Sequence, residues 1–543
     1  MQTYTNSNPR SSTAFWFRVI AAVYCVYAAL FILDTSFGIN GTLWFSLFDD
    51  AMVSMRFARN LAQGHGLVWN PGGERVEGFT NPLWVGVMAA LHLLPVAESK
   101  ICLLVQLLCA GILLANLFAI RALAAEFLGR DNPWTLFAVF LTAFFYPLNY
   151  WTLQGMEVGA LALLVAYATL LTLRRQAEGK GVLPVYLLLG VGTFLRLDAA
   201  IPFLVILFYG FCTPSPRRVG NGVSGLMLLV LFLGIQTAAR HAYYQEWVPN
   251  TYTLKMTGFP ALARVEHGMR MFYGFAARTN WLLVAAPILL LVFRADMRHV
   301  LLMLLFGAQC AYSIYVGGDS WEWNGMANRF ITTVMPFYFV LLACTLAIVV
   351  PKLAEAVPPI IMEKSKWVPA VVLWGFLAAI TANFNYRLGL SSIEEWLLQR
   401  RPLHVLDNKQ HVELALAIRE GTQRDATVAV VWAGSIPYFS DRVCLDQLGK
   451  CDKQIAAMKA KKTPAHMAQY KFYPGHNKWD FDYSIVAQKP DLVVETWPPM
   501  VPVMDRLVDS YTSITVAGMP VYWRNDSQKV DIAKLTFAGS GKL

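Results

Sequence analysis

Apolar runs of near membrane-spanning length recur through most of this 543-residue chain. A transmembrane helix needs about 20 consecutive apolar residues. Runs at or somewhat below that length occur at 15–33, 100–122, 134–151, 156–173, 182–197, 199–212, 221–239, 281–293, 299–316, 330–350 and 367–385. With 56% hydrophobic and only 15% charged residues, the chain lies outside the range of an ordinary soluble domain. The pattern predicts a polytopic α-helical membrane protein with about eleven transmembrane helices.

The run from Pro82 to Pro95 decides how these helices are oriented. It is bounded by prolines and too short for a comfortable crossing, so it fits either a span or a helix lying in the membrane interface. If it does not cross, every basic cluster falls on the side of the N-terminus, as expected for cytoplasmic loops. These clusters are Arg10 and Arg18; Arg121 and Arg130; Arg174, Arg175 and Lys180; Arg217 and Arg218; Arg294 and Arg298; and Lys352, Lys364 and Lys366. We therefore predict an interfacial helix at 82–95, a retained first helix and a cytoplasmic N-terminus.

A second domain begins where the apolar runs stop, near residue 386. A helical stretch at 409–420 precedes strand-like segments at 426–432, 442–446 and 491–495 and a final pair at 513–518 and 520–525. We predict a transmembrane module over 1–385, with its first outer loop at 34–99, and an α/β cap domain over 386–543. An odd number of spans places this cap on the extracytoplasmic, periplasmic side of the cytoplasmic (inner) membrane. The net charge of +10 suits anionic membrane lipid and requires no nucleic-acid partner.

Two adjacent aspartates follow the first predicted span, in the stretch FDDAMVSMRFARNLAQGHGLVWNPGGERVEGFTNPLW from Phe48 to Trp84. Asp49 and Asp50 precede a helical pattern at 51–62, where one carboxylate would cap the exposed amides. Capping does not explain the second, because an adjacent carboxylate at a membrane surface adds desolvation cost and like-charge repulsion. We therefore expect at least one of the pair to be functional.

Four later outer segments carry further polar groups, although charges near a membrane are costly and tend to mark sites. They contain Glu157; Arg196 and Asp198; Asn250, Tyr252 and Lys255; and Asp319 and Arg329. The alternatives to a functional role are a structural Arg196–Asp198 pair and, for Arg56 and Arg59, snorkelling or pairing with the two aspartates. Five outer segments on one face nevertheless predict a shared cavity.

The stretch from Phe48 to Trp84 resembles the first outer loop of polytopic glycosyltransferases of the C-type fold (GT-C), which use polyprenyl-phosphate sugars. The similarity is greatest to the AftB-like arabinofuranosyltransferases, whose donor is decaprenyl-phosphoarabinose. QGMEVG, FLRLDAAIPF, EWVPNTYTLK and YVGGDSWEWNGMANRF resemble further motifs of that branch, as do GSIPYFSDRVCLDQLG and GHNKWDFDYSIVAQKPDLVV in the predicted cap. The chain departs from the pattern of that branch in two respects: it has Arg-Leu-Asp where Arg-Pro-Asp is expected, and it contains the cysteines Cys444 and Cys451.

The resemblance implies a GT-C-like membrane module with interfacial helices, an external cap, and transfer of D-arabinofuranose outside the membrane. In this fold an aspartate of the first outer loop acts as catalytic base, which carries over to Asp49 or Asp50. The acceptor does not carry over, because related enzymes decorate cell-envelope glycans or a surface protein such as type IV pilin.

The chemistry of such a transfer fits the residues independently. A lipid phosphate leaving group needs nearby cations, and the incoming hydroxyl needs a carboxylate. We expect Asp49 to deprotonate the acceptor, with Asp50 orienting it or sharing the role, and the attack to invert the anomeric centre. The candidate phosphate ligands are Arg56, Arg59, Arg196, Lys255 and Arg329. The candidate sugar or acceptor ligands are His65, Asn70, Glu77, Thr80, Asn81, Glu157, Asp198, Asn250 and Asp319.

The sequence leaves several points open. No metal-binding spacing stands out, although the paired aspartates could bind a divalent cation. Cys444 and Cys451 could form a disulfide if the cap faces an oxidising compartment. A mannosyl or other hexosyl lipid is the alternative donor. From other classes, a transporter or flippase for a lipid-linked sugar and a non-catalytic scaffold are the competing hypotheses, and the absence of visible repeats argues against the transporter.

Overall fold

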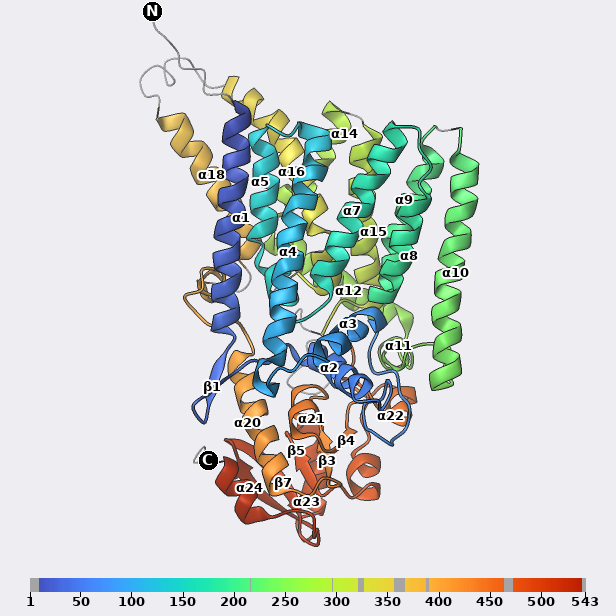
Figure 1. The fold of residues 1–543 in the computed structure, drawn as a ribbon, viewed down its shortest axis with the longest axis vertical. Coiled ribbons are helices and arrows are strands. Elements are labelled where there is room, and N and C mark those ends of the chain that lie inside the picture. Colours follow the sequence, from blue (N-terminus) through green and yellow to red (C-terminus); the bar gives the residue numbers. More distant parts are fainter. Residues whose placement is uncertain are drawn as a thin grey trace, which may run out of the picture.

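The structure, a computed structural model, describes residues 9–214, 216–294, 296–320, 327–355, 367–386, 390–462 and 472–539. A helical bundle forms one part of the molecule, a cap domain lies at one end of it, and short helices lie between the two (Figure 1). Helix α1 (Pro9–Asp34) begins at the bundle end opposite the cap, whereas α24 (Ile532–Gly539) lies in the cap. Lys364, Lys366, the stretch 321–326 and the side chain of Arg10 lie outside the description.

The bundle is built from the predicted apolar runs. Besides α1 it contains α4 (Glu98–Leu128), α5 (Pro133–Ala143), α6 (Tyr146–Leu153), α7 (Val158–Ala177), α8 (Leu183–Leu195), α9 (Ala200–Cys212), α10 (Arg218–Tyr244), α12 (Ala261–Arg278), α13 (Trp281–Ala285), α14 (Leu289–Phe293), α15 (Met297–Val316), α16 (Arg329–Glu355) and α18 (Val368–Asn385). Six of the described helices are long and apolar enough to cross a membrane, and eight are if each of two bent helix pairs counts as one span. Three other predicted runs form shorter apolar helices, at 183–195, 197–212 and 369–385.

One bundle element has no counterpart among the predicted runs. Helix α12 is followed, after a bend of 100°, by α13 and α14, which carry the predicted run 281–293. Its sequence, ALARVEHGMRMFYGFAAR, interleaves charged and apolar residues, so it contains no continuous apolar stretch. Amphipathic helices of this kind are missed by a search for membrane-length apolar runs.

A layer of short elements separates the bundle from the cap. It contains the hairpin β1 (Phe37–Ile39) and β2 (Thr42–Trp44), and the helices α2 (Asp49–Ala62), α3 (Pro82–His92) and α11 (Asn250–Met256). Helix α3 is the short run predicted to lie in the interface, and in Figure 1 it lies beside α2 at the cap end of the bundle. Ten of the 14 residues of α2 are buried, because it is covered by the bundle on one side and by the cap on the other.

The cap domain is built on a five-stranded sheet in the order β4-β3-β5-β7-β6. Its strands are β3 (Thr427–Val430), β4 (Val443–Asp446), β5 (Leu492–Val494), β6 (Tyr511–Val516) and β7 (Met519–Arg524). Its helices are α20 (Val405–Gly421), α21 (Ser435–Ser440), α22 (Lys453–Ala457), α23 (Val501–Arg506) and α24. The preceding helix α19 (Leu390–Trp396) contacts the bundle, where Trp396 Nε1 donates to the Phe144 carbonyl. Strand β3, between β4 and β5, is parallel to both neighbours: Val428 pairs with Cys444 on one side and with Leu492 on the other.

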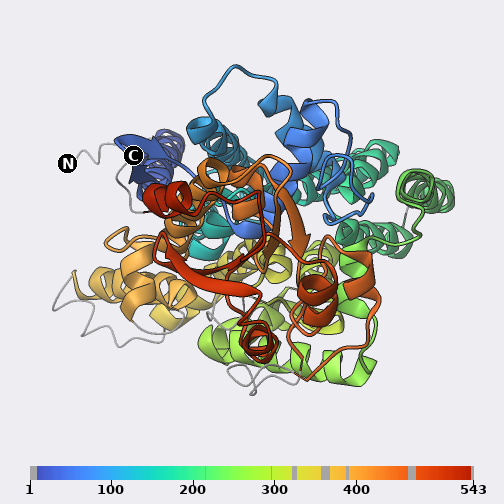
Figure 2. The same cartoon turned by 90° about the horizontal axis from the view of Figure 1, so that it is seen from below.

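The sheet agrees with the strands expected from the sequence, because each short apolar segment there is bounded by polar or turn-forming residues. The predicted class, a polytopic α-helical membrane protein with a C-terminal α/β domain, is confirmed. Seen from the cap side, the cap lies over the middle of the bundle end, and α10 stands at the periphery (Figure 2). The cap therefore covers the ends of those helices that carry the predicted polar cluster.

Candidate functional site

A cavity opens where the bundle, the short-helix layer and the cap meet. We call it the main cavity; it encloses about 1090 Å³, including the part open to solvent. Its polar lining includes Asp50, Thr80, Asn81, Glu157, Arg196, Asp198, Lys255, Asp319, Arg329 and Lys450. Apolar side chains, among them Phe79, Met156, Tyr312 and Phe330, complete the walls. All five outer segments expected to converge contribute to it, and Lys450 adds a sixth segment from the cap.

Asp50 lies in the first turn of α2, at the boundary between the bundle and the cap. Its carboxylate forms ion pairs with Arg329 Nη1, at 2.9 Å, and with Lys450 Nζ. Burial by itself raises the pKa of this carboxyl, but Lys450, Arg329 and Lys255 together hold it well below its ordinary value. Asp50 is therefore an ionised carboxylate at the edge of the cavity.

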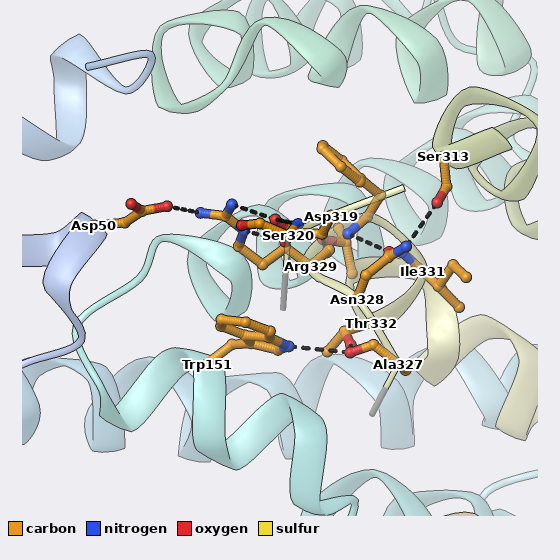
Figure 3. Close-up of polar contacts among 12 residues, drawn as sticks. Asp50, Trp151, Ser313, Asp319, Ser320, Ala327, Asn328, Arg329, Ile331 and Thr332 are labelled. Carbon is orange, nitrogen blue, oxygen red and sulfur yellow. Dashed lines mark hydrogen bonds and ion pairs between the residues drawn. The ribbon is translucent and has the colours of Figure 1, made fainter. Parts of the chain in front are cut away.

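Arg329, the first residue of α16, links two carboxylates. Its Nη1 donates to Asp50, while Nε and Nη2 donate to Asp319 Oδ2 and Oδ1 at 2.6 and 2.8 Å (Figure 3). Trp151 lies against the guanidinium, with its ring centroid 5.6 Å from Cζ. Burial raises the pKa of Asp319, but the paired guanidinium lowers it further, below the ordinary value. The bidentate contact fixes the orientation of Arg329.

A second arginine of the lining, Arg196, lies at the corner between α8 and α9. Arg196 donates through Nε and Nη2 to both oxygens of Asp198, at 2.9 Å each, and its Nε lies 3.6 Å from Glu157. Asn81 Nδ2 donates to Glu157 at 2.8 Å and Gln309 to Asp198 at 2.8 Å. Arg196 Nη1 is buried without a hydrogen-bond partner among the described residues. The predicted Arg196–Asp198 pair therefore forms, and it lies on the cavity wall.

Lys255 differs from the other cations of the main cavity in having no ion pair with a described carboxylate. It is held on α11. Burial lowers the pKa of its ammonium to about 8, partly offset by the nearby Asp50. A partly buried cation with no ion-pair partner gains most from binding an anion.

Lys450 was not predicted. It lies in the loop between β4 and α22, and its loop is fixed by Asp446, whose carboxylate accepts hydrogen bonds from the amides of Leu448, Gly449 and Cys451. Asn250 also holds this loop, since its Nδ2 donates to the carbonyls of Gly449 and Lys450 at 2.9 Å. No local sequence signal distinguishes this lysine from those on an ordinary domain surface.

Asp49 faces the cap instead of the main cavity. Its Oδ1 accepts a hydrogen bond from the amide of Ser435 at 2.9 Å, at the start of α21. Burial raises the pKa of this carboxyl to about 6, although Lys450 and this amide oppose the rise. Neither aspartate is the N-cap of α2; that position is Phe48, and both carboxylates lie in the first turn. Asp49 lines a second, smaller cavity together with Asp50.

Two of the predicted phosphate ligands lie elsewhere. Arg56 is buried on the face of α2 that meets the cap, where it donates to the carbonyls of Trp69, Pro437 and Arg442. Arg59 pairs with Asp441 at 2.8 Å and donates to the Tyr438 carbonyl. We therefore correct their assignment: both arginines attach the cap to the module, because α2 turns this face away from the main cavity.

Four predicted sugar or acceptor ligands also lie away from the main cavity. Asn70 bridges Arg56 and the backbone of Cys444. Glu77 is buried in an ion pair with Arg240 of α10. His65 is exposed on its loop, and Asn250 orders the Lys450 loop as described above. The polar groups of Asn70, Glu77 and Asn250 hold backbone or partner side chains in place. Thr80 and Asn81, in contrast, line the main cavity.

The possible disulfide does not form in the structure: Cys444 and Cys451 are both free and buried. The Cys444 thiol on β4 lies 3.5 Å from the Arg442 carbonyl, whereas Cys451 packs against Gly78 of the first outer loop. Different neighbours therefore enclose the two thiols. Within the described part of the chain, no group of three or more His, Cys, Asp or Glu side chains is arranged to hold a metal ion.

Comparisons with known proteins place the fold. The model of a family described as a domain of unknown function (DUF8728) matches residues 400–532, which form most of the cap. No curated protein matches the sequence. ArnT from Cupriavidus metallidurans in its apo state has a similar structure, with a TM-score of 0.56 and 12% identity over 94% of this chain and 98% of that one.

Two structures of the Archaeoglobus fulgidus oligosaccharyltransferase are similar as well. The apo form has a TM-score of 0.56 and 12% identity over 97% of this chain and 77% of that one. The form tethered to an acceptor peptide with the NVT sequon has a TM-score of 0.53 and 12% identity over 95% of this chain and 74% of that one. Similarity over nearly the whole chain shows that this protein has the GT-C fold.

Proposed function

We propose that this protein is an inverting membrane glycosyltransferase that moves a sugar from a polyprenyl-phosphate donor to an acceptor hydroxyl on the extracytoplasmic side of the cytoplasmic membrane. The observation that carries the proposal is the ionised Asp50 carboxylate among Arg329, Lys450 and Lys255 at the edge of a large cavity. The names of the two oligosaccharyltransferase structures with the same fold agree with a transferase of this class.

The reaction needs one proton acceptor and stabilisation of one leaving group. The acceptor oxygen attacks the anomeric carbon while its proton passes to Asp50, and the bond from that carbon to the phosphate oxygen breaks. The electron pair leaves with the phosphate, which changes from a diester with one negative charge to a monoester with an additional charge. Lys255, Arg329 and Arg196 face the cavity where that charge develops, so they stabilise the transition state more than the ground state.

Charge balance supports a monophosphate donor. Four cations and four carboxylates line the main cavity: Arg196, Lys255, Arg329 and Lys450, and Asp50, Glu157, Asp198 and Asp319. Lys255 alone among the cations lacks an ion pair with a described carboxylate. One uncommitted cation matches the single charge of a phosphodiester better than the larger charge of a diphosphate.

Position favours Asp50 over Asp49 as the base, in contrast to the expectation from the sequence. Asp50 lines the main cavity, whereas Asp49 lines only the second one and accepts a hydrogen bond from Ser435. A phosphate that draws Lys450 away from Asp50 would raise the proton affinity of its carboxylate. Donor binding therefore prepares Asp50 to accept a proton, and Asp49 acts by positioning α2.

The sugar and the acceptor rest on the resemblance of the first outer loop. We propose D-arabinofuranose as the sugar and a cell-envelope glycan or surface protein as the acceptor; a mannosyl or other hexosyl lipid is the alternative donor. Divalent-cation dependence is tested by adding a chelator to the same assay.

The test compares Asp50→Asn, Asp49→Asn and the exposed control Asp505→Asn, purified and folded. Each is incubated with radiolabelled polyprenyl-phosphoryl arabinofuranose or the mannose equivalent, and release of the lipid phosphate is measured. We expect Asp50→Asn to lose at least 100-fold in kcat, within the range of general-base contributions, while Asp49→Asn loses less and the control is unaffected. Full activity of Asp50→Asn refutes the assignment.

A further inference from the structure

The second cavity meets the main cavity at the Asp50–Lys450 ion pair. It encloses about 450 Å³, including its open part, and shares Asp50, Lys255, Lys450 and Pro474 with the main cavity. Its remaining lining is Asp49 and Ser320 from the membrane module and Val431, Trp432, Ala433, Asp446, Leu448, Gly475 and His476 from the cap. Asp50 is therefore accessible from two sides, one facing the membrane helices and one facing the cap.

The location of this cavity in the cap sheet is typical of a ligand site. Val431 and Trp432 directly follow the parallel strand β3, and Asp446 ends its parallel neighbour β4. In open α/β sheets, ligands bind outside the carboxyl ends of the parallel strands. Here that edge faces Asp49 and Asp50 of the module.

His476 supplies a hydrogen-bond acceptor to the cavity. Its Nδ1 lies 3.0 Å from the Pro474 carbonyl. A carbonyl can only accept, so Nδ1 carries the hydrogen and donates it. Burial lowers the pKa of the imidazole to about 4, which keeps the ring neutral and leaves Nε2 with a lone pair. No hydrogen bond to Nε2 occurs among the described residues.

The hydrogen-bonding groups of the cavity suit a ligand with several hydroxyls. Asp49, Asp50 and neutral His476 accept hydrogen bonds, whereas Lys255 and Lys450 donate them. Trp432 adds an aromatic wall beside these polar groups. Polar groups set among aromatic and apolar walls are typical of small-ligand sites. A sugar offers several hydroxyls at once, whereas a serine or threonine side chain offers one.

Resting on the proposed function, we infer that the second cavity is the acceptor subsite, and that it takes the terminal sugar of a neutral glycan with His476 Nε2 accepting a hydrogen bond from one of its hydroxyls. The attacking hydroxyl then reaches Asp50 from the cap side, while the donor phosphate occupies the main cavity. The cap domain thereby determines acceptor choice, and the membrane module determines donor choice.

The experiment separates acceptor binding from donor cleavage. His476→Ala, His476→Gln and Trp432→Ala are compared with Gln454→Ala, an exposed cap residue outside both cavities. Transfer to neutral arabino- and manno-oligosaccharides is measured alongside hydrolysis of the donor by water without acceptor. We expect His476→Ala and Trp432→Ala to raise the acceptor KM five- to tenfold, as for one lost hydrogen bond or contact, with hydrolysis and donor KM within about twofold. His476→Gln, which retains an acceptor oxygen, recovers part of the loss.

Different failures have different meanings. If the variants reduce transfer and hydrolysis equally with no change in acceptor KM, the cavity is not the acceptor subsite. If a serine- and threonine-containing peptide is glycosylated in a His476-dependent manner and the oligosaccharides are not, the subsite is correct and the sugar class is overturned. If the unmodified protein neither transfers nor hydrolyses the sugar lipid, the proposed function itself fails.

Discussion

Replacing Lys450 by methionine tests whether the cap completes the active site. The substitution removes the ammonium from its partly buried ion pair with Asp50 and keeps an unbranched apolar side chain. At an effective dielectric constant of about 20, two unit charges about 3 Å apart attract by roughly 5 kcal/mol. Deleting one partner of a buried pair costs about 3–5 kcal/mol. Because Arg329 still neutralises Asp50, we expect a value near the lower end, about 3 kcal/mol.

Two measurements follow from this magnitude. The melting temperature of the purified protein in detergent should fall by several degrees. If Lys450 also binds the donor phosphate, the loss of a charge-assisted hydrogen bond of about 1.5–3 kcal/mol should lower kcat/KM for the donor roughly 10- to 100-fold. Lys450→Arg should retain part of the activity, and the exposed Lys459→Met serves as matched control.

A double variant separates stability from catalysis. In Lys450→Met/Asp50→Asn neither charge of the pair remains, so the melting temperature should recover towards that of the unmodified protein while activity stays lost. An unchanged melting temperature and an unchanged donor KM in Lys450→Met would show that the Asp50–Lys450 pair contributes neither to stability nor to donor binding. Recovery of activity in the double variant would contradict the role of Asp50 as base.

Two further predictions concern the contact between Asp49 and the cap. In Gly434→Ala, the new Cβ would lie 2.1 Å from the Asp49 carbonyl oxygen, so α2 must shift. We expect faster limited proteolysis of the cap and lower transfer activity. Gly111→Ala serves as control, because its Cβ would meet no atom within 4 Å. For Asp49→Asn, the pKa of the replaced carboxyl is raised to about 6 in the folded protein, so its unfavourable contribution appears as the pH rises from about 4 through 6. The free energy of unfolding of the variant should therefore rise relative to that of the unmodified protein over this range, by up to roughly 3 kcal/mol at pH 7, and its melting temperature should rise with it. A melting-temperature difference that does not change with pH would contradict the raised pKa.

The sequence predicts those features that depend on local composition. A helix that crosses a membrane needs a long apolar run, and the strands of the cap are short apolar segments between turns, so both are visible along the chain. The adjacent carboxylates Asp49 and Asp50 stand out for a similar local reason, because two charges beside a span are costly. Helix α12 was missed because its apolar residues are interleaved with charged ones.

The roles of individual side chains depend on contacts between distant segments. Arg56 and Arg329 looked equally suited to phosphate, yet one meets carbonyls of the cap and the other faces the main cavity. That difference is set by the rotation of α2 against a domain more than 370 residues away in sequence. Lys450 could not be singled out for the same reason, since only its position opposite Asp50 distinguishes it.

The contacts around α2 explain why such a site needs a cap. Asp50 is partly buried and ionised, and one of its two paired cations comes from the cap. On the opposite face of the same helix, the buried Arg56 guanidinium donates to carbonyls of Pro437 and Arg442 in the cap. Without the cap, both charged groups would lose partners, and an uncompensated buried charge is strongly unfavourable. Docking of the cap therefore also completes the set of charges around Asp50. An acceptor that binds between the cap and the module contacts the same residues that keep Asp50 ionised and in position.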